Sequence, residues 1–109
     1  MADRPRILGQ LAPSATTLTD LFTVAVNTRA VVSTVMVCNR GATDTTFRVS
    51  VAINGAADTV AQYIHFDQPI VARRSWPITI GITLNAGDVI RVFAGNANLS
   101  FNAFGTELT

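Results

Sequence analysis

The chain has 109 residues, the length of a single domain that can bury a sizeable core. Its net charge is only +1, which does not favour a nucleic-acid partner. Charged residues make up 14% of the chain, and all eight basic residues are arginines. Arginine without lysine favours contacts that become buried, although a bias in genome composition would give the same count. So little charge predicts either an efficient core or apolar surface covered by partners.

Neither a membrane span nor a secretion signal is expected. No apolar run approaches the ~18 residues that a membrane helix needs. The polar start, residues 1–6, is not followed by the apolar region of a signal peptide. Cys38 is the only cysteine, so no intrachain disulfide can form. These features predict a protein that is synthesised in the cytoplasm and not secreted.

The first third of the chain predicts an arm followed by strands. We expect residues 1–6 to form an N-terminal arm and residues 7–109 to form one domain. Residues 6–11 are predicted as a short edge strand, residues 12–20 as a loop and residues 21–26 as a strand. The long segment 30–39 has apolar side chains on both faces, with Val35 and Val37 on one and Met36 and Cys38 on the other. This pattern is typical of a central strand that is covered on both sides.

The middle of the chain continues this pattern. Residues 45–53 alternate between apolar and polar, which predicts a strand, and Asn54-Gly55 predicts a turn. Another strand is expected over residues 61–66, followed by a connection over residues 70–75. No segment shows a helical period with caps, so essentially no helix is expected.

The stretch 76–108 gives the clearest pattern of all. Ile78, Ile80, Ile82 and Leu84 alternate with smaller residues, which places the four aliphatic side chains on one face of a strand. Turn residues follow at 85–88 and 95–98, and strands are expected over residues 89–94 and 99–103. We expect these three strands to form an antiparallel meander, with Leu84 opposite Ile90 and the aliphatic face in the core.

In that register, two aromatic and two polar side chains share the outer face. They are Arg91, Phe93, Asn102 and Phe104. Aromatic residues beside an arginine are typical of interface hot spots, so this face is predicted to be a subunit contact, together with Arg4 and Arg6 of the arm. The alternatives are that a loop covers this face, or that the register differs by one residue and Phe93 is core.

Seven to nine short strands separated by turns predict an all-β protein. We expect a single antiparallel β-sandwich of jelly-roll type.

No set of residues predicts catalysis or metal binding. His65 is the only histidine and has no potential ligand at metal spacing, so it is interpreted as a half-buried strand residue. Cys38 is interpreted as a small buried residue, and nothing local supports a Cys38–His65 catalytic pair. The carboxylates are scattered among turns, and no spacing supports a calcium site at Asp44 and Asp58. The sequence predicts neither an enzyme nor a cofactor, metal or small-molecule substrate.

A second candidate patch contains Tyr63, Arg73, Arg74 and Trp76. Arginines beside a tryptophan can anchor a ligand or a protein partner. The alternative is a solvated loop next to one core tryptophan.

Several strand and turn segments resemble a known class. They are Val37-Cys38-Asn39-Arg40-Gly41, Thr46-Phe47-Arg48-Val49, Gln62-Tyr63-Ile64, Ile80-Gly81-Ile82-Thr83-Leu84, Ala86-Gly87-Asp88-Val89-Ile90 and Ser100-Phe101-Asn102. Together, over roughly residues 6–108, they resemble small all-β virion proteins of tailed bacteriophages. The segment around Leu84–Ile90 is also similar to trimeric jelly-roll modules of the C1q and tumour-necrosis-factor type. The resemblance implies a structural component of a phage particle, made in the host cytoplasm, and no catalytic residues come with it.

Two functions follow as hypotheses. The first is a capsid decoration or cement protein that acts through contacts with copies of itself, with a trimer favoured, and with other virion proteins such as the major capsid protein. The second is a receptor- or glycan-binding module of a tail or fibre, in which Tyr63 or Trp76 supplies an aromatic platform.

Overall fold

The computed structural model describes residues 3–109 and is built almost entirely of strands. Two short 3₁₀ turns, η1 (Ile53–Gly55) and η2 (Val60–Gln62), are the only helical segments in this range. The strands are β1 (Asp3–Leu11), β2 (Thr19–Thr23), β3 (Arg29–Asn39), β4 (Thr45–Ala52), β5 (Tyr63–Ile70), β6 (Ser75–Ile78), β7 (Ile82–Leu84), β8 (Val89–Ala94) and β9 (Leu99–Leu108).

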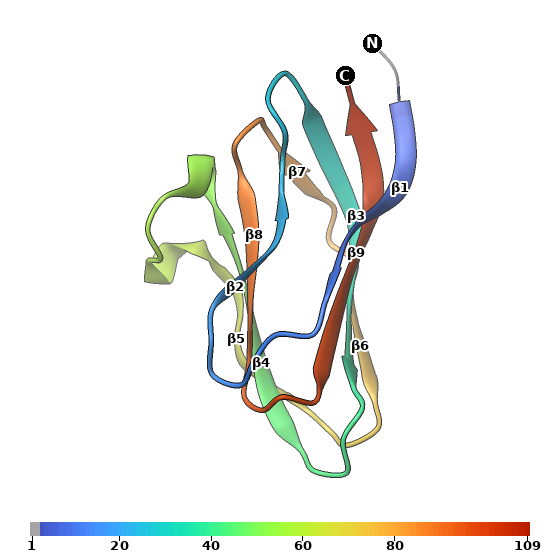
Figure 1. The fold of residues 1–109 in the computed structure, drawn as a ribbon, viewed down its shortest axis with the longest axis vertical. Coiled ribbons are helices and arrows are strands. Elements are labelled where there is room, and N and C mark those ends of the chain that lie inside the picture. Colours follow the sequence, from blue (N-terminus) through green and yellow to red (C-terminus); the bar gives the residue numbers. More distant parts are fainter. Residues whose placement is uncertain (1–2) are drawn as a thin grey trace.

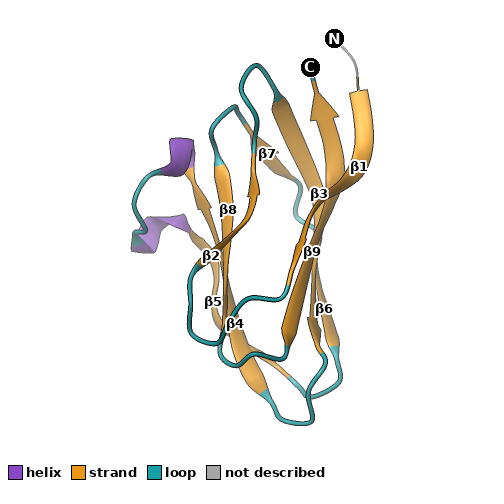
Figure 2. Ribbon diagram, in the orientation of Figure 1, coloured by secondary structure: helices purple, strands orange, loops and turns teal. Residues whose placement is uncertain are grey.

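The strands form two antiparallel sheets packed face to face, so the predicted all-β sandwich is confirmed (Figure 1). Sheet A has the order β1-β9-β3-β6, and β7 also pairs with β3. Sheet B has the order β2-β8-β4-β5. Along the chain, each connection crosses to the other sheet except two: β4 to β5 stays in sheet B, and β6 to β7 stays in sheet A. Figure 2 shows that most of the loops lie at the two ends of the sandwich, whereas the loop between the two helical turns projects from its side.

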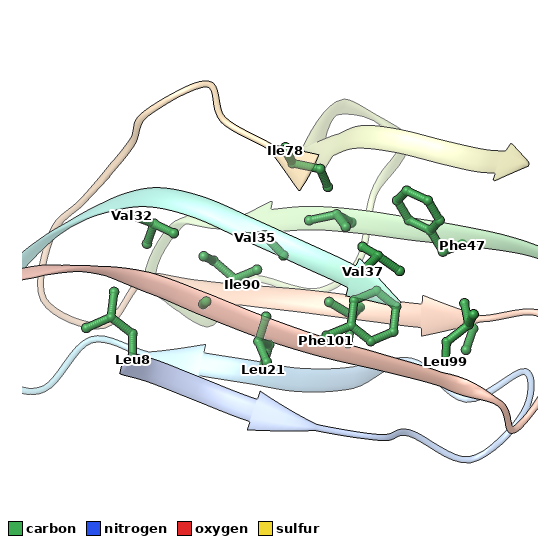
Figure 3. Close-up of a cluster of buried hydrophobic side chains, with 14 of the residues drawn as sticks. Leu8, Leu21, Val32, Val35, Val37, Phe47, Ile78, Ile90, Leu99 and Phe101 are labelled. Carbon is green, nitrogen blue, oxygen red and sulfur yellow. The ribbon is translucent and has the colours of Figure 1, made fainter. Parts of the chain in front are cut away.

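The core lies between the sheets and is formed by alternate residues of the strands. Phe47 of β4 and Phe101 of β9 are fully buried, and their rings meet edge to face with centroids 6.3 Å apart. Figure 3 shows how aliphatic side chains from both sheets surround them. Eight of the inward positions predicted for the end of the chain are buried, and they are Ile78, Leu84, Ile90, Val92, Ala94, Leu99, Phe101 and Ala103.

The predicted meander of the last three strands is wrong. β7 and β9 both pair with β3 in sheet A, whereas β8 pairs with β2 and β4 in sheet B. The turn after Leu84 therefore crosses from one sheet to the other. Asp88 holds this turn, because its carboxylate accepts hydrogen bonds of 2.9 Å from the backbone N–H groups of Asn85 and Asn54. Ile80, expected in the core, lies between β6 and β7 and is exposed.

The expectation of a separate arm over residues 1–6 also needs correction. Asp3–Arg6 are the first residues of β1 and pair with the end of β9, from Asp3 opposite Leu108 to Arg6 opposite Gly105. They are ordered by their own chain, without a neighbouring subunit. Residues 1 and 2 lie outside the described part of the chain.

Prolines occupy three of the four outermost strands. Pro5 lies in β1, Pro69 in β5 and Pro77 in β6. A proline has no backbone N–H to donate, so it weakens any pairing with an additional strand. Both outermost strands of sheet A, and the β5 edge of sheet B, are therefore poorly suited to pairing with an additional strand.

Candidate assembly surfaces

The outer face of sheet A, which we call the A face, is built from cross-strand rows of side chains. Cross-strand partners share a face of a sheet. One row joins Ile7, Phe104 and Thr34, and the next joins Pro77, Met36, Asn102 and Gln10. The remaining members are Pro5, Thr106, Val31, Thr83, Ser75, Cys38 and Ser100.

No charged side chain lies in these rows. The nearest charges on this face are Asp3 and Arg29, which flank Leu108 at the end of the sheet. Three large apolar side chains are exposed: Ile7 at 49%, Val31 at 37% and Phe104 at 36%. A continuous uncharged face with exposed apolar side chains is typical of a protein contact surface.

The central strand β3 explains part of this surface. Its predicted central position is confirmed, because it lies between β9 on one side and β6 and β7 on the other. Its inner face is covered by sheet B, but its outer face, with Met36 and Cys38, belongs to the A face. The prediction that Cys38 is buried is wrong, because this residue is partly exposed. The apolar pattern on both faces of β3 therefore exceeds what its own fold covers.

The outer face of sheet B, the B face, has a different chemistry. The Arg48 guanidinium lies between two aromatic rings, 4.1 Å from the centroid of Phe66 and 4.4 Å from that of Phe93. The same group donates a 2.7 Å hydrogen bond to the Asp67 carboxylate, which raises the pKa of Arg48. Cation–π contacts of this kind stabilise the arrangement by about 1 kcal/mol each. Phe93 is thus half-buried against its own chain.

The segment that contains η1 and η2 lies against this same B face. Arg91 donates hydrogen bonds to the carbonyl oxygens of Ala56 and Gly55, at 2.7 and 3.2 Å, and pairs with the Asp20 carboxylate at 3.2 Å. Figure 1 shows this segment projecting from the side of the sandwich formed by β4, β5 and β8. The chain therefore partly covers its own B face, and the A face has no such cover among residues 3–109.

The candidate interface residues do not share one surface. Arg91 and Phe93 lie on the B face, whereas Asn102 and Phe104 lie on the A face. The prediction of a single outer face depended on the meander and fails with it. Arg4 and Arg6 lie near the end of sheet A, where both contact the buried carboxylate of Glu107, at 3.8 and 2.6 Å.

The second candidate patch is also divided. Tyr63 begins β5, where its ring meets Phe66 edge to face at 5.1 Å and its hydroxyl donates a 2.9 Å hydrogen bond to Asp58. The pKa of Tyr63 is raised, mainly because the side chain is partly buried and secondly because of this hydrogen bond. Arg73, Arg74 and Trp76 come after the far end of β5, which is about 20 Å away at ~3.3 Å per residue.

The structure adds Arg40 to the part of that patch that contains Arg73, Arg74 and Trp76. The backbone N–H of Asn39 donates a 2.8 Å hydrogen bond to the carbonyl of Arg74, so the loops after β3 and after β5 lie side by side. The sequence gives no local signal for this neighbourhood, because Arg40 and Arg74 are 34 positions apart. Three arginines thus come together at one end of the sandwich.

Residues 3–109 contain no group of three or more His, Cys, Asp or Glu side chains placed to hold a metal ion. None of the helical segments in this range is long and apolar enough to span a membrane.

The chain is thus a small antiparallel β-sandwich with an uncharged A face, a B face that the chain partly covers itself, and three arginines in the loops at one end. Neither a known protein family nor a curated protein matches its sequence. Among solved structures, it is similar to a pentameric capsid protein from metagenomic phage sequences, with 14% identity and a TM-score of 0.40. The alignment covers 96% of this chain but only 58% of that capsid protein, so the chain spans less than two thirds of its length. A likeness at this level carries no conclusion about function.

Proposed function

We propose that this protein is a non-enzymatic structural component of a tailed-phage virion. In this role it decorates or cements the capsid through contacts between its own copies and with the coat protein. The assignment to a phage particle rests on the sequence resemblance over residues 6–108. The A face is the observation that carries the assembly role, because it is uncharged, exposes large apolar side chains and is not covered by its own chain.

The size of the A face is compatible with such a contact. Four strands about 4.8 Å apart span roughly 19 Å, and the rows from Val31 to Cys38 span about 25 Å at ~3.3 Å per residue. The face therefore covers roughly 500 Å² per copy, or about 1,000 Å² for two copies, which is the lower limit for a specific interface. We expect isolated copies to associate weakly and the particle to stabilise the contact.

The occupant that fits this face best is a second copy of the chain. A face without charge has no group that would pair with a charged partner, whereas two identical uncharged surfaces can cover each other. The prolines in β1, β5 and β6 disfavour association through the edges of the sheets. Copies are therefore expected to meet face to face.

The oligomeric state in solution tests this proposal. Phe104→Glu places a charge in the centre of the A face, and a buried unpaired carboxylate is costly. Light scattering or sedimentation at increasing protein concentration should show association for the natural protein and a monomer for the variant. Thr23→Glu is the matched control, because it adds the same charge at an exposed strand position of sheet B.

Two results would contradict the assembly role of the A face. One is a natural protein that stays monomeric at every concentration and also fails to join particles. The other is equal loss of association in the Thr23 and Phe104 variants.

The cluster on the B face favours a second candidate function. Phe66 is 57% exposed and has Tyr63, Arg48 and Asp67 around it. An exposed ring with polar neighbours is the arrangement that a glycan-binding module of a tail or fibre would use. Phe66→Ala should abolish binding on a glycan array if this is the function, and it should leave particle incorporation unchanged if the first proposal is correct.

A further inference from the structure

The arginines of this chain divide into two groups. Four have a carboxylate of their own chain between 2.6 and 3.8 Å away, and they are Arg4, Arg6, Arg48 and Arg91. The other four, Arg29, Arg40, Arg73 and Arg74, have no such partner among residues 3–109. Three of these four lie at one end of the sandwich, in the loops after β3 and β5.

Backbone hydrogen bonds hold these loops together. Besides the bond from Asn39 to Arg74, the N–H of Arg40 donates to the carbonyl of Asn98 at 2.9 Å. The Arg40 guanidinium donates to the carbonyl of Ala97 at 3.2 Å, which places its charge over the β8–β9 loop. The end is thus a fixed surface, which we call the basic end, defined by Arg40, Arg73 and Arg74.

The basic end has little negative charge to balance it. The four loops at this end, residues 12–18, 40–44, 71–74 and 95–98, contain one acidic residue, Asp44. The Asp44 carboxylate already accepts a 2.9 Å hydrogen bond from the backbone N–H of Ala72. The loops therefore present three positive charges against one negative charge that has a partner.

The local backbone adds a second observation. Arg73 has φ = 62°, a left-handed conformation that costs about 1 kcal/mol for residues other than glycine or asparagine. Arg74 follows in the same loop, and edge strand β6 begins at the next residue, Ser75, so Trp76 is only two residues from Arg74. Trp76 is exposed, so a flat aromatic ring is accessible close in sequence to Arg73 and Arg74.

We propose that the basic end, with Trp76, binds a carboxylate-rich segment of another virion protein; this inference rests on the proposed function. Arginine binds carboxylates through two parallel hydrogen bonds, and a neighbouring aromatic ring anchors the apolar part of such a segment.

A second copy of the chain is a poor partner for the basic end. Six of its seven carboxylates already have a hydrogen-bond or ion-pair partner in their own chain: Asp20, Asp44, Asp58, Asp67, Asp88 and Glu107. Only Asp3 lacks one among residues 3–109. A nucleic acid fits less well, because the net charge is +1 and the three cations occupy one end instead of a groove along the molecule. An acidic segment of a different protein can supply carboxylates without a partner, and it can bind at one end of the molecule.

The fluorescence of Trp76, the only tryptophan, provides a direct test. Short poly-glutamate peptide is titrated into the protein at low salt, with poly-glutamine as the uncharged control. We expect poly-glutamate alone to change the tryptophan emission. Replacing Arg40, Arg73 and Arg74 together by Gln should weaken its binding at least tenfold. The matched control is Arg29→Gln, which removes an unpaired arginine at the opposite end of β3.

Several outcomes would overturn this proposal. They are no binding of poly-glutamate, equal loss in the Arg29 variant, or tighter binding of a single-stranded oligonucleotide than of poly-glutamate. Self-association separates this inference from the proposed function. The triple variant should still associate through the A face, and Phe104→Glu should still bind the peptide.

Discussion

Phe101 and Phe104 of β9 provide a sharp test of the two faces of sheet A. Phe101 points inward, is fully buried and meets the ring of Phe47, whereas Phe104 points outward and is one-third exposed. Phe101→Ala should lower the free energy of unfolding by about 4 kcal/mol, from lost burial, the cavity left behind and the lost aromatic pair. Phe104→Ala should cost about 1 kcal/mol in the monomer, because solvent already reaches its ring.

Urea unfolding at dilute, monomeric concentration measures both values. The unfolding entropy is ~2.1 cal/mol/K per residue, so for this chain a loss of 1 kcal/mol in the free energy of unfolding lowers Tm by about 4 °C. Phe101→Ala should therefore lower Tm by about 17 °C, and Phe104→Ala should lower it by about 4 °C. Equal losses for the two variants, with an unchanged urea dependence, would refute the reasoning. They would mean that the chain itself covers the A face.

Gly105, Asp88 and Tyr63 provide further tests of the loops and sheets, and Cys38 provides a test of the self-association. Gly105→Ala should prevent folding, because the added Cβ would overlap the carbonyl oxygen of Val31, and circular dichroism will show the loss. Asp88→Ala should cost about 2 kcal/mol in urea unfolding, since it leaves two backbone N–H groups without their acceptor. A thiol reagent should label Cys38 in the native monomer and label it more slowly as copies associate. Burial and a hydrogen bond raise the pKa of Tyr63, the only tyrosine, so its ultraviolet titration midpoint should lie above the ordinary 10.0 in the folded protein and near that value in urea. The stability that Tyr63 contributes is therefore fully present below pH 10.0 and is lost as the pH rises through the higher, folded-state pKa.

The sequence predicted which side chains of the last strands point inward, because alternation is a local property. It could not predict how those strands pair. Leu84 and Ile90 face the same core whether their strands are neighbours in one sheet or lie in opposite sheets. The choice is made by contacts distant in sequence, such as the bond from Asn54 to the Asp88 carboxylate. The meander was therefore compatible with the pattern and still wrong.

The same limit explains the candidate surfaces. Phe104 was correctly expected to be an outward residue, but its predicted neighbour Phe93 lies on the opposite side of the molecule. The neighbourhood of Arg40 and Arg74 depends on two loops that meet only after both sheets have formed. By contrast, the excess of apolar residues on both faces of β3 was visible in the sequence. What the sequence could not reveal is which of those faces the chain itself covers.

The two ends of the described chain leave the sandwich at one place, because Asp3 pairs with Leu108 (Figure 1). This place is the end opposite Arg40, Arg73 and Arg74. A peptide fused to either terminus would therefore project away from the basic end. Since neighbouring strands are about 4.8 Å apart, a linker of a few residues would join the termini, and new ends could be opened in a surface loop. The fold thus offers a scaffold for display in which the fused cargo and the basic end stay on opposite sides.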